Sequence, residues 1–456
     1  MLLTVVACTT QFLVVLDVSV VHVALPSIRA ALGFDTAGLQ WVVTGYMLAF
    51  GGALLLGGRL ADLFGTRRVL MCGLTVFVVA ALVAGLAWRP EVLVLARTVQ
   101  GVGAAALSPV SLTLLTREIT EERQRTRALA VWGGVAAAAG AAGVFVGGLV
   151  TEFLNWRWTM LLNVPVGLAL YPLACRAVPR RPASGARRSP DVVGALSLTA
   201  ALGLCVYGAL SADLVPLLAG GGLLCAALLW EGKWARDPLL PLTVLRSRSV
   251  AGANAAMFLT ASATFSMWYF LSLHLQNERH FSPLATGLAF LPQYLAVVAG
   301  AQLAPRLIPA YGTRRVLLAG SALQCAGFLW LAGASAHASF LTHVLLPGFL
   351  ITFALGISST PLTLAATGGV RAADAGLASG LVNTARHLGG AVGVAALTAF
   401  AYRSGGVAPV FRIDAVLLAA TASLALALPA SPVRTARAPS ATARDGNERT
   451  NRSEPA

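Results

Sequence analysis

This chain of 456 residues has little charge and almost no lysine. Only 11% of its residues are charged, whereas 57% are hydrophobic, and Lys233 is the single lysine beside 32 arginines. A soluble domain does not carry apolar segments of about 20 residues one after another along its length. The scarcity of charge therefore excludes a soluble fold and indicates a protein that crosses a membrane many times.

Motifs for metal binding, nucleotide binding and covalent catalysis are also missing. The chain has no Gly-Lys-Ser or Gly-Lys-Thr phosphate-binding motif and no evident nucleophile with a neighbouring base. Its cysteines lack the spacing of metal ligands, so we interpret them as structural thiols. The six are Cys8, Cys72, Cys175, Cys205, Cys225 and Cys325. We expect no enzyme activity, no metal, no cofactor and no use of ATP.

Alternation of polar and apolar residues, the pattern of membrane strands, is absent, and the apolar segments are continuous. We therefore predict an all-α polytopic membrane protein with fourteen transmembrane helices. The first segment has no basic start and contains Asp17, so we interpret it as a mature helix and not a signal peptide. The predicted spans are 3–25, 40–60, 69–88, 92–114, 128–150, 159–178, 192–211, 214–231, 250–275, 284–304, 316–336, 339–361, 376–400 and 411–430.

The distribution of basic residues predicts the orientation. With a cytoplasmic N-terminus, 25 of the 33 Lys and Arg residues fall in cytoplasmic segments, 6 in external loops and 2 inside helices. This asymmetry is the positive-inside pattern of a cell-membrane protein with both termini in the cytoplasm. The net charge of +15 is thus a consequence of topology, and we expect no nucleic-acid partner. We expect lipid headgroups to contact Arg180, Arg181, Arg187 and Arg188.

The string Gly-Thr-Arg-Arg-Val-Leu occurs twice, at 65–70 and at 312–317. Both copies follow an aromatic residue and lie on the predicted cytoplasmic side, after spans two and ten, so chance is the weaker explanation. An offset of eight spans preserves orientation, which predicts a parallel repeat of two six-helix halves separated by an inserted helix pair. The copies differ upstream, because the first has Asp62 where the second has Pro309.

Basic, proline-rich connectors mark the boundaries of this repeat. We assign 1–178 to the N-terminal half, 179–249 to the linker and inserted helices, and 250–430 to the C-terminal half. The remaining segment, 431–456, contains few residues that could pack in a core, and we expect a disordered cytoplasmic tail.

Asp17 is the only acidic residue that we expect deep inside a span. Counted from Pro26, it lies about 13 Å from the end of its helix, and Arg97, counted from Pro90, lies about 10 Å deep. The two side chains can therefore share a level. An acid whose pairing changes between conformations can load and release a proton, whereas a static ion pair that orients two helices is the alternative.

Further polar residues and glycines fall inside spans. Arg386 lies near the middle of span thirteen, and we expect no buried acid in the second half to neutralise it, which leaves carbonyls, water or an anionic ligand group. Candidates for a central cavity are His22, Gln100, Asn163, Asn383 and Arg386. Span five carries Gly143, Gly147 and Gly148, which are explained equally well by close helix packing and by a hinge.

The loop between spans two and three contains Gly58, Asp62, Gly65, Arg67 and Arg68. Glycines allow a tight turn, and an acid can accept hydrogen bonds from the free donors at a helix start. A simple positive-inside loop is the alternative, but it leaves Asp62 unexplained.

Together these motifs resemble those of the major facilitator superfamily, and within it the 14-span drug:proton antiporter family. The resemblance covers all fourteen spans and rests on residues 16–26, 58–68 and 97–101, and on 156–158 followed by 163–167. It implies proton coupling at Asp17 and proton transfer at Arg97. It also implies that the loop with Gly58, Asp62, Gly65, Arg67 and Arg68 is a gating loop, with gating contacts at Asp62. Two departures concern the same family patterns: His22 stands where Asn is usual, and Val144 follows Gly143 where Pro is usual.

We therefore expect a monomeric, proton-coupled exporter of small amphipathic compounds that works by alternating access. His22 either titrates or forms a neutral structural contact, and the missing proline weakens the argument for the direction of transport. Proton-coupled uptake of a nutrient is one alternative. A membrane sensor or scaffold that does not transport is another, and it predicts a folded signalling module that the short tail does not offer.

Overall fold

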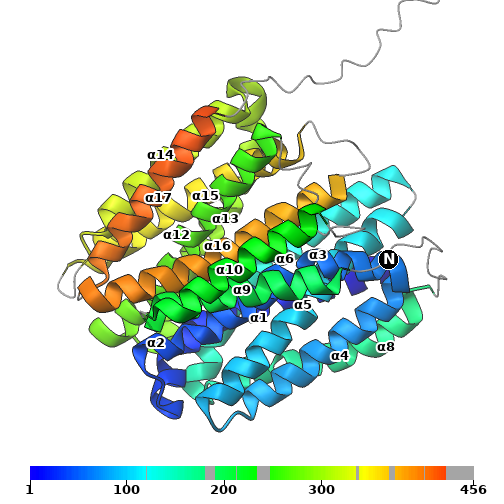
Figure 1. The fold of residues 1–456 in the computed structure, drawn as a ribbon, viewed down its shortest axis with the longest axis horizontal. Coiled ribbons are helices and arrows are strands. Elements are labelled where there is room, and N and C mark those ends of the chain that lie inside the picture. The colour runs from blue at the N-terminus through cyan, green and yellow to red at the C-terminus, as the bar shows by residue number, and fades with distance from the viewer. Residues whose placement is uncertain are drawn as a thin grey trace, which may run out of the picture.

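The computed structural model describes residues 1–119, 121–179, 191–211, 213–233, 247–334, 338–368, 375–404 and 406–427. Its first half consists of long helices in the order of the chain (Figure 1). They are α1 (Leu2–Leu32), the short α2 (Thr36–Leu39), α3 (Trp41–Phe64), α4 (Thr66–Gly85), α5 (Pro90–Glu118), α6 (Glu122–Phe153), and α7 (Arg157–Leu161) with α8 (Asn163–Ala177).

Two helices then precede a second group. The pair is α9 (Val192–Ser211) and α10 (Leu214–Lys233). The second group is α12 (Arg248–Leu273) with the π-helix η1 (His274–Glu278), α13 (Pro283–Tyr311), α14 (Thr313–Leu331), η2 (Leu341–Leu345) with α15 (Leu346–Thr367), α16 (Ala375–Ser404) and α17 (Ala408–Ala427). Counting α7 with α8, η1 with α12 and η2 with α15, the described residues form fourteen long helices.

These helices confirm the predicted all-α membrane fold. Eleven of them are long and apolar enough to cross a membrane by length and composition, and α9, α14 and α16 complete the set. Several run past the predicted spans, because a helix continues beyond the hydrocarbon layer, which is about 30 Å thick. For example, α1 passes through Pro26 to Leu32 and ends at Gly33, whose φ is 72°.

The repeated string has the same local structure in both copies. Gly65 separates α3 from α4 with φ 89° and ψ 139°, and Gly312 separates α13 from α14 with φ 81° and ψ 153°. The amide of Gly65 donates to Ala61 O at 3.1 Å, and that of Gly312 donates to Ile308 O at 2.8 Å. Both glycines adopt a backbone conformation that residues with a side chain rarely adopt. The sequence repeat is therefore also a conformational repeat.

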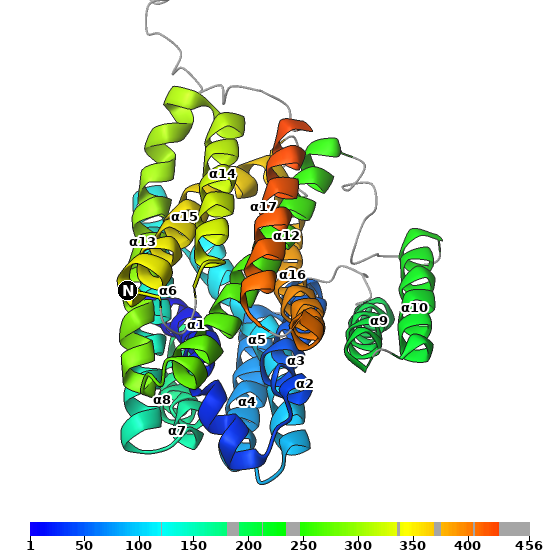
Figure 2. The ribbon, with the colours of Figure 1, turned by 90° about the vertical axis from the view of Figure 1, so that its left-hand side faces the viewer.

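The two groups meet mainly along two helix pairs, α3 with α16 and α6 with α13, and α1 also contacts α12. The α9–α10 pair lies to one side of the bundle (Figure 2), where α9 packs on both α3 and α16. A Cβ atom at Gly52 of α3 would collide with the Thr199 side chain of α9, so these two helices approach closely. The inserted pair thus covers one edge of the seam between the groups.

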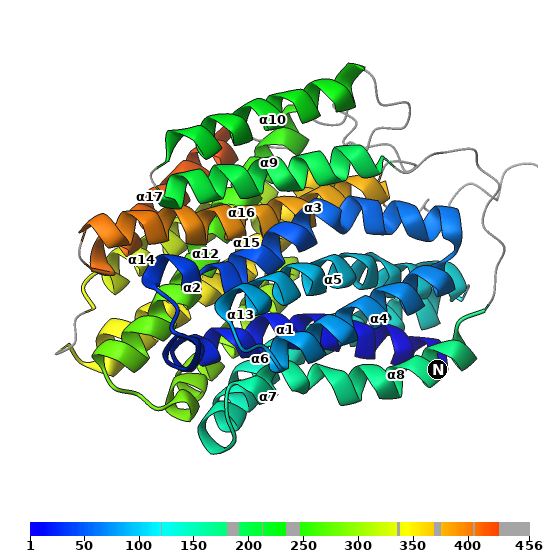
Figure 3. The ribbon, with the colours of Figure 1, turned by 60° about the horizontal axis from the view of Figure 1, so that its bottom comes forward.

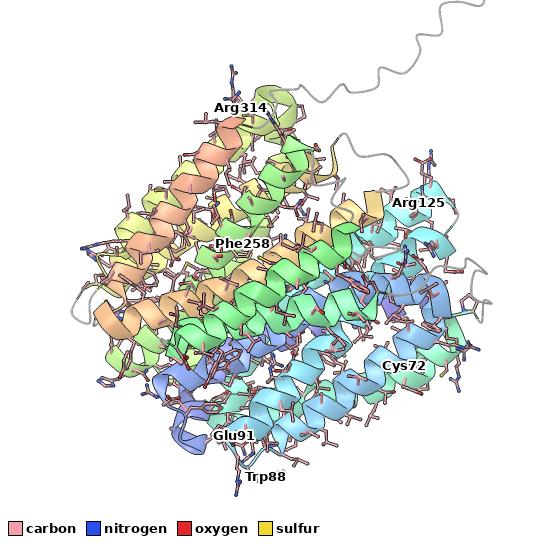
Figure 4. All side chains as sticks on the ribbon, in the orientation of Figure 1. Cys72, Trp88, Glu91, Arg125, Phe258 and Arg314 are labelled. Atoms are coloured by element: carbon pink, nitrogen blue, oxygen red, sulfur yellow. The ribbon has the colours of Figure 1, made fainter. Side chains whose placement is uncertain are left out.

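The long helices extend between two ends of the bundle (Figure 3). The labelled Arg125 and Arg314 lie toward one end, and Trp88 and Glu91 lie toward the other (Figure 4). In Figure 1, helices α13, α14 and α17 diverge from the first group toward the end that carries Arg314. We call this the basic end. It is the end that the charge distribution assigns to the cytoplasm.

Parts of the predicted domain scheme lie outside the described residues. These are the tail at 431–456, most of both linkers, and Arg180, Arg181, Arg187 and Arg188. The division into halves at 1–178 and 250–430 remains a proposal, which the equivalent positions of Gly65 and Gly312 support.

Candidate functional site

A buried ion pair joins α1 to α5 in the first half. The Asp17 carboxylate and the Arg97 guanidinium are fully buried, and Arg97 Nη1 donates to Asp17 Oδ2 at 2.7 Å. The depths that we calculated from Pro26 and Pro90 placed both residues at one level, and the contact agrees with that prediction. An isolated charge here would be very costly, so each residue stabilises the ionised form of the other.

Two amides complete the hydrogen bonds of the Asp17 carboxylate. Gln100 Nε2 donates to Asp17 Oδ1 at 2.9 Å, and Asn163 Nδ2 donates to the same oxygen at 2.7 Å. Gln100 lies one turn after Arg97 on α5, and Asn163 is the first residue of α8. Both amides were predicted as cavity residues, and both belong to this cluster of Asp17, Arg97, Gln100 and Asn163, which we call the Asp17 cluster.

Arg97 has three further partners besides Asp17. Its Nη1 donates to Gln100 Oε1 at 2.8 Å, and its Nε donates to Val42 O of α3 at 3.3 Å. The guanidinium carbon lies 4.3 Å from the centre of the Tyr46 ring, which is a cation–π contact. The guanidinium would therefore retain favourable contacts if its bond to Asp17 were broken.

Small residues bring these helices together. A Cβ atom at Gly101 of α5 would collide with Tyr46 O of α3, and one at Gly45 would lie 2.8 Å from Thr98 Oγ1. Only glycine therefore permits the distance at which Tyr46 reaches the Arg97 guanidinium. The sequence indicated the polar residues of α5, but Tyr46 and the Val42 carbonyl carry no motif that we could identify, and we missed both.

The Trp-Arg-Trp segment positions the start of α7. Arg157 Nη1 donates to Gly85 O at 3.3 Å and also to Ala87 O, and its guanidinium lies 4.7 Å from the Trp156 ring centre. The carbonyls at the end of α4 have no partner within the helix, so this arginine caps them. The cap fixes the segment that precedes Asn163.

Asp17 is not the only deeply buried acid, and our expectation to that effect is wrong. Asp414 in α17 is fully buried, and its Oδ2 accepts a hydrogen bond from Ser266 Oγ of α12 at 3.1 Å. The predicted span began at residue 411, but α17 begins at Ala408, so Asp414 lies in its second turn. The second half therefore does contain a buried acid, contrary to our prediction.

His22 lies on α1, one turn beyond Asp17, and is buried at 1% exposure. Neither ring nitrogen has a hydrogen-bond partner among the described residues, so the expected contact with a neighbour is not formed by the ring. The ring centre lies 6.2 Å from that of Trp268 in α12, which stacks on Tyr294 of α13 at 5.1 Å. His22 thus faces the second group of helices.

Asn383 and Arg386 lie on α16 and do not join the Asp17 cluster. Asn383 Nδ2 donates within its own helix, to Ser379 O at 3.2 Å. Arg386 is partly buried, and we find no hydrogen-bond or ion-pair partner for it among the described residues. The next residue, His387, stacks on Phe50 of α3 with ring centres 4.0 Å apart. These residues therefore lie where α16 meets the first half.

The three glycines predicted in span five are packing positions of α6. A Cβ atom at Gly143 would collide with the Ser19 side chain of α1, and one at Gly147 would lie 2.8 Å from Val20 O. At Gly148 the Cβ atom would lie 2.7 Å from Pro283 O of α13. Gly143 and Gly147 therefore bring α6 against α1, and Gly148 brings it against the second group.

The predicted loop at 58–68 is helical except at Gly65, because α3 extends to Phe64 and α4 begins at Thr66. This segment contacts the ends of α5 and α8 at the basic end. Asp62 Oδ1 lies 2.9 Å from Arg117 Nη2 at the end of α5, and Arg67 Nη1 donates to Val178 O after α8 at 3.2 Å. Arg68 is exposed. The ion pair is about half exposed, so its contribution to stability is small, about 0–1 kcal/mol.

Gly57, which directly precedes this segment and which we did not predict, makes the close approach to α5. A Cβ atom at Gly57 would collide with Ala105 O of α5, whereas one at Gly58 would make an ordinary contact of 3.9 Å with Pro109. The requirement for glycine at position 57 arises from helix packing, which the loop motif alone does not report.

At the opposite end, three hydrogen bonds join the two groups of helices. Ser272 Oγ donates to His22 O at 2.6 Å, and Gln276 Nε2 donates to Val23 O at 2.8 Å. The amide of Leu284 donates to Glu152 Oε2 at 2.9 Å. We call these contacts the latch. They hold α1 and α6 against α12 and α13 at the end that is predicted to face outside.

The sequence is similar to a known family and to curated proteins. The family model described as Major Facilitator Superfamily matches residues 7–394 and 254–452. A cephamycin export protein of Amycolatopsis lactamdurans is 42% identical over 409 residues, which are 86% of this chain and 83% of that protein. A puromycin resistance protein of Streptomyces alboniger is 38% identical over 441 residues, covering 93% and 88%. A lincomycin resistance protein of Streptomyces lincolnensis is 38% identical over 394 residues, covering 84% and 81%.

Two solved structures share the fold. A nucleoside transporter superposes with a TM-score of 0.67, covering 93% of this chain and 99% of that chain. A peptide transporter described as auto-inhibited superposes with a TM-score of 0.68, covering 93% and 94%. Both are 14% identical in sequence, so they support the helical architecture alone.

Proposed function

The chain belongs to the major facilitator superfamily, and we propose that it exports small amphipathic compounds, such as antibiotics or other drugs, in exchange for protons. The curated relatives named for cephamycin export and for puromycin and lincomycin resistance support export as the direction. Each aligns over more than four fifths of both chains. The relatives support transport across the membrane as the function. The Asp17 cluster supports the proposal that this transport is coupled to protons.

The observation that carries the proposal is the buried Asp17 carboxylate with its three donors. A proton added to Asp17 removes the charge that holds Arg97 Nη1 at 2.7 Å. Gln100 and Asn163 would still face the carboxyl group, because both are fixed by their helices. Protonation therefore loosens the bond between α1 and α5 without removing every polar partner of the acid.

Arg97 makes this step feasible because it has alternative partners. When Asp17 is neutral, the guanidinium keeps Gln100 Oε1, Val42 O and the Tyr46 ring. An arginine without such partners would be buried and uncompensated, at a cost of several kcal/mol. We propose that Arg97 moves toward α3 when Asp17 binds a proton and returns when the proton leaves.

Alternating access requires one end of the bundle to be closed while the other opens. The latch closes the end that carries Trp88, and the two groups diverge toward the basic end in Figure 1. With the basic end in the cytoplasm, this arrangement corresponds to a state that faces the cytoplasm. We propose that Asp62 and the loop at 58–68 act in closing that end, and that α6 moves with α1 through Gly143 and Gly147.

The remaining parts of the proposal concern location and partners. We propose that the protein lies in the cell membrane as a monomer, with both termini in the cytoplasm and the proton gradient as its energy source. The sequence contains no nucleotide-binding motif, which favours a gradient over ATP.

Reconstitution in lipid vesicles tests the proposed exchange. Purified protein is placed in vesicles with an imposed pH gradient, and uptake or release of fluorescent dyes and antibiotics is followed for the wild type and for Asp17→Asn. We expect the wild type to move cargo only with the gradient and the variant to lose that dependence. Because asparagine retains a carbonyl oxygen and has a similar volume, we expect the variant to fold. Gel filtration and thermal melting check this.

Gradient-driven transport by Asp17→Asn equal to the wild type would exclude proton coupling through this residue. Transport that ignores the gradient in both proteins would exclude proton exchange altogether. Uptake into right-side-out vesicles in the same direction as the proton gradient would favour nutrient import over export.

A further inference from the structure

Arg386 lies at the seam between the two groups, and no acidic side chain among the described residues neutralises its guanidinium. It lies in the middle of α16, partly buried, and no ion pair or hydrogen bond of its side chain is found among the described residues. An ionisable residue inside a membrane helix is costly and usually marks a site of function. The residues around Arg386 therefore indicate which ligand its charge can bind.

The side of α16 that carries Arg386 faces α3 of the first group and α12 of its own group. A Cβ atom at Gly390, one turn later, would lie within 2.6 Å of Phe265 in α12 and would collide with Met47 in α3. Residues four apart lie on the same side of a helix, so Arg386 also faces the region between α3 and α12. His387 confirms the proximity of α3 through its stack on Phe50.

No acidic residue lies at the level of Arg386 on the neighbouring helices. Helices α9, α12, α15 and α16 contain no Asp or Glu in their helical segments, and α3 contains only Asp62. His387 and Leu388 lie beside Gly51 of α3, and Gly52 lies beside Thr199 of α9. Residues 51–52 of α3 and Thr199 of α9 are therefore at about the same height in the bundle as Arg386. At 1.5 Å per residue, Asp62 is about 15 Å away along α3, and Asp191 about 12 Å away along α9.

The buried acids are also excluded as partners. Glu231 of α10 is buried and lies beside Gly194 of α9, toward Asp191 and away from the level of Thr199. Asp17 already accepts hydrogen bonds from Arg97, Gln100 and Asn163. Asp414 binds Ser266 of α12. Gly389 of α16 packs on Phe258 of α12, and Gly393 packs on Ser262, so the two helices run side by side with a constant offset. With the same offset Ser266 is level with residue 397, which lies about 16 Å along the helix axis from Arg386. The Asp17 cluster contains one acid and one base and is neutral, so the seam retains one positive charge.

We infer that Arg386 is the binding site for an acidic group of the cargo, and that the cargo class is amphipathic organic carboxylates. This inference rests on the proposed export function. A guanidinium offers two parallel N–H donors that match the two oxygens of a carboxylate. Phe265, which lies beside Gly390, and Phe50, which stacks on His387, provide aromatic surface for the body of the molecule. Cargo binding then supplies the missing negative charge.

A matched pair of dyes tests the inference by equilibrium binding. Rhodamine B carries a free carboxylate, and its ethyl ester has the same ring system without it. Binding of each dye to purified protein in detergent is measured by fluorescence anisotropy, with no pH gradient. We expect the wild type to bind the acid at least about tenfold more tightly than the ester, since charge-assisted hydrogen bonds to buried groups have this magnitude.

Three variants identify the residue responsible. Arg386→Gln is expected to bind acid and ester equally, and Arg386→Lys is expected to keep part of the preference, because lysine retains the charge without the planar pair of donors. Arg412→Gln removes an exposed arginine from α17 and should leave the preference unchanged. Gel filtration and thermal melting establish that each variant is folded.

The assignment is overturned if the wild type binds acid and ester equally, if it binds no acid, or if Arg386→Gln keeps the preference. Transport of both dyes in vesicles with a pH gradient separates this result from the proposed function. A wild type that prefers the acid in binding but transports neither dye retains the anion site and loses the export proposal. Gradient-driven transport that is the same for acid and ester overturns the anion site and retains export.

Discussion

The Asp17 carboxylate and the Arg97 guanidinium lie 2.7 Å apart, although 80 residues separate them in the chain. Neither residue is exposed, and the buried carboxylate depends on Arg97 as its cation. The energy of this ion pair can be measured as a stability difference, separately from any transport assay.

Arg97→Gln should destabilise the protein more than the double variant with Asp17→Asn. The single change leaves a buried carboxylate without its cation, at an expected cost of about 3–5 kcal/mol, whereas the double change removes both charges. Thermal melting in detergent of the two single variants and the double variant gives the coupling energy. Additive losses in the three variants would contradict an ion pair that contributes to folding.

Gly147→Ala should destabilise the protein, and Gly133→Ala on the same helix should not. A Cβ atom at Gly147 would lie 2.8 Å from Val20 O of α1, whereas nothing lies within 4 Å of one at Gly133. Both changes gain helix propensity, up to about 1 kcal/mol, so the difference between them reports the contact of α6 with α1. Thermal melting of both variants checks this, and equal melting temperatures would mean that α6 can move away from α1 at little cost.

Removing the latch should favour opening of the end that carries Trp88. The variant combines Ser272→Ala with Gln276→Leu, and each lost hydrogen bond is expected to shift the equilibrium by about 1 kcal/mol, or several-fold. Trp88 and Tyr402, both strongly exposed, are replaced by cysteine and spin-labelled in a background without other cysteines. The labels report the distance between the two groups of helices. We expect a longer-distance population to grow.

Ser211→Ala is the control for this experiment, because its hydroxyl donates only to Tyr207 O within α9. Its distance distribution should match that of the unmodified background. If the latch variant also gives an unchanged distribution, the hydrogen bonds of Ser272 and Gln276 do not set the balance between the two states.

The sequence was sufficient to predict most of the fold, because the constraint is simple and local. A helix must keep its backbone hydrogen bonds within the hydrocarbon layer, so continuous apolar segments report nearly every helix. Helix ends were less predictable, since α1 continues through Pro26 to Leu32 where charged headgroups and water no longer penalise polar residues. The repeated string was the strongest guide, and both copies share a positive φ at glycine.

The site was predictable where depth along a helix decided the contact. Counting residues from helix ends was enough to bring Asp17 to Arg97. It could not identify Tyr46 or the Val42 carbonyl, because those contacts depend on how α3 rotates against α5. Asp414 was missed because an acid within one turn of a span end is ambiguous in sequence, and an extension of three residues buries it.

Substitution of the two repeat glycines should separate stability from transport. Gly65 and Gly312 have φ of 89° and 81°, a region in which a side chain costs about 1–3 kcal/mol. No neighbouring atom lies within 4 Å of a Cβ atom at Gly312, so backbone strain is the main cost there. We expect Gly65→Ala and Gly312→Ala to lower the melting temperature by similar amounts.

Their effects on transport should differ, because the surroundings of the two turns differ. The first turn follows Asp62, which pairs with Arg117 at 2.9 Å, and the second follows Pro309, which cannot form an ion pair. A strained first turn should displace Asp62 and slow gradient-driven dye transport, while Gly312→Ala should retain most of it when compared at equal amounts of folded protein. Equal loss of transport in the two variants would show that both turns contribute alike, and that gating is not concentrated in the N-terminal half.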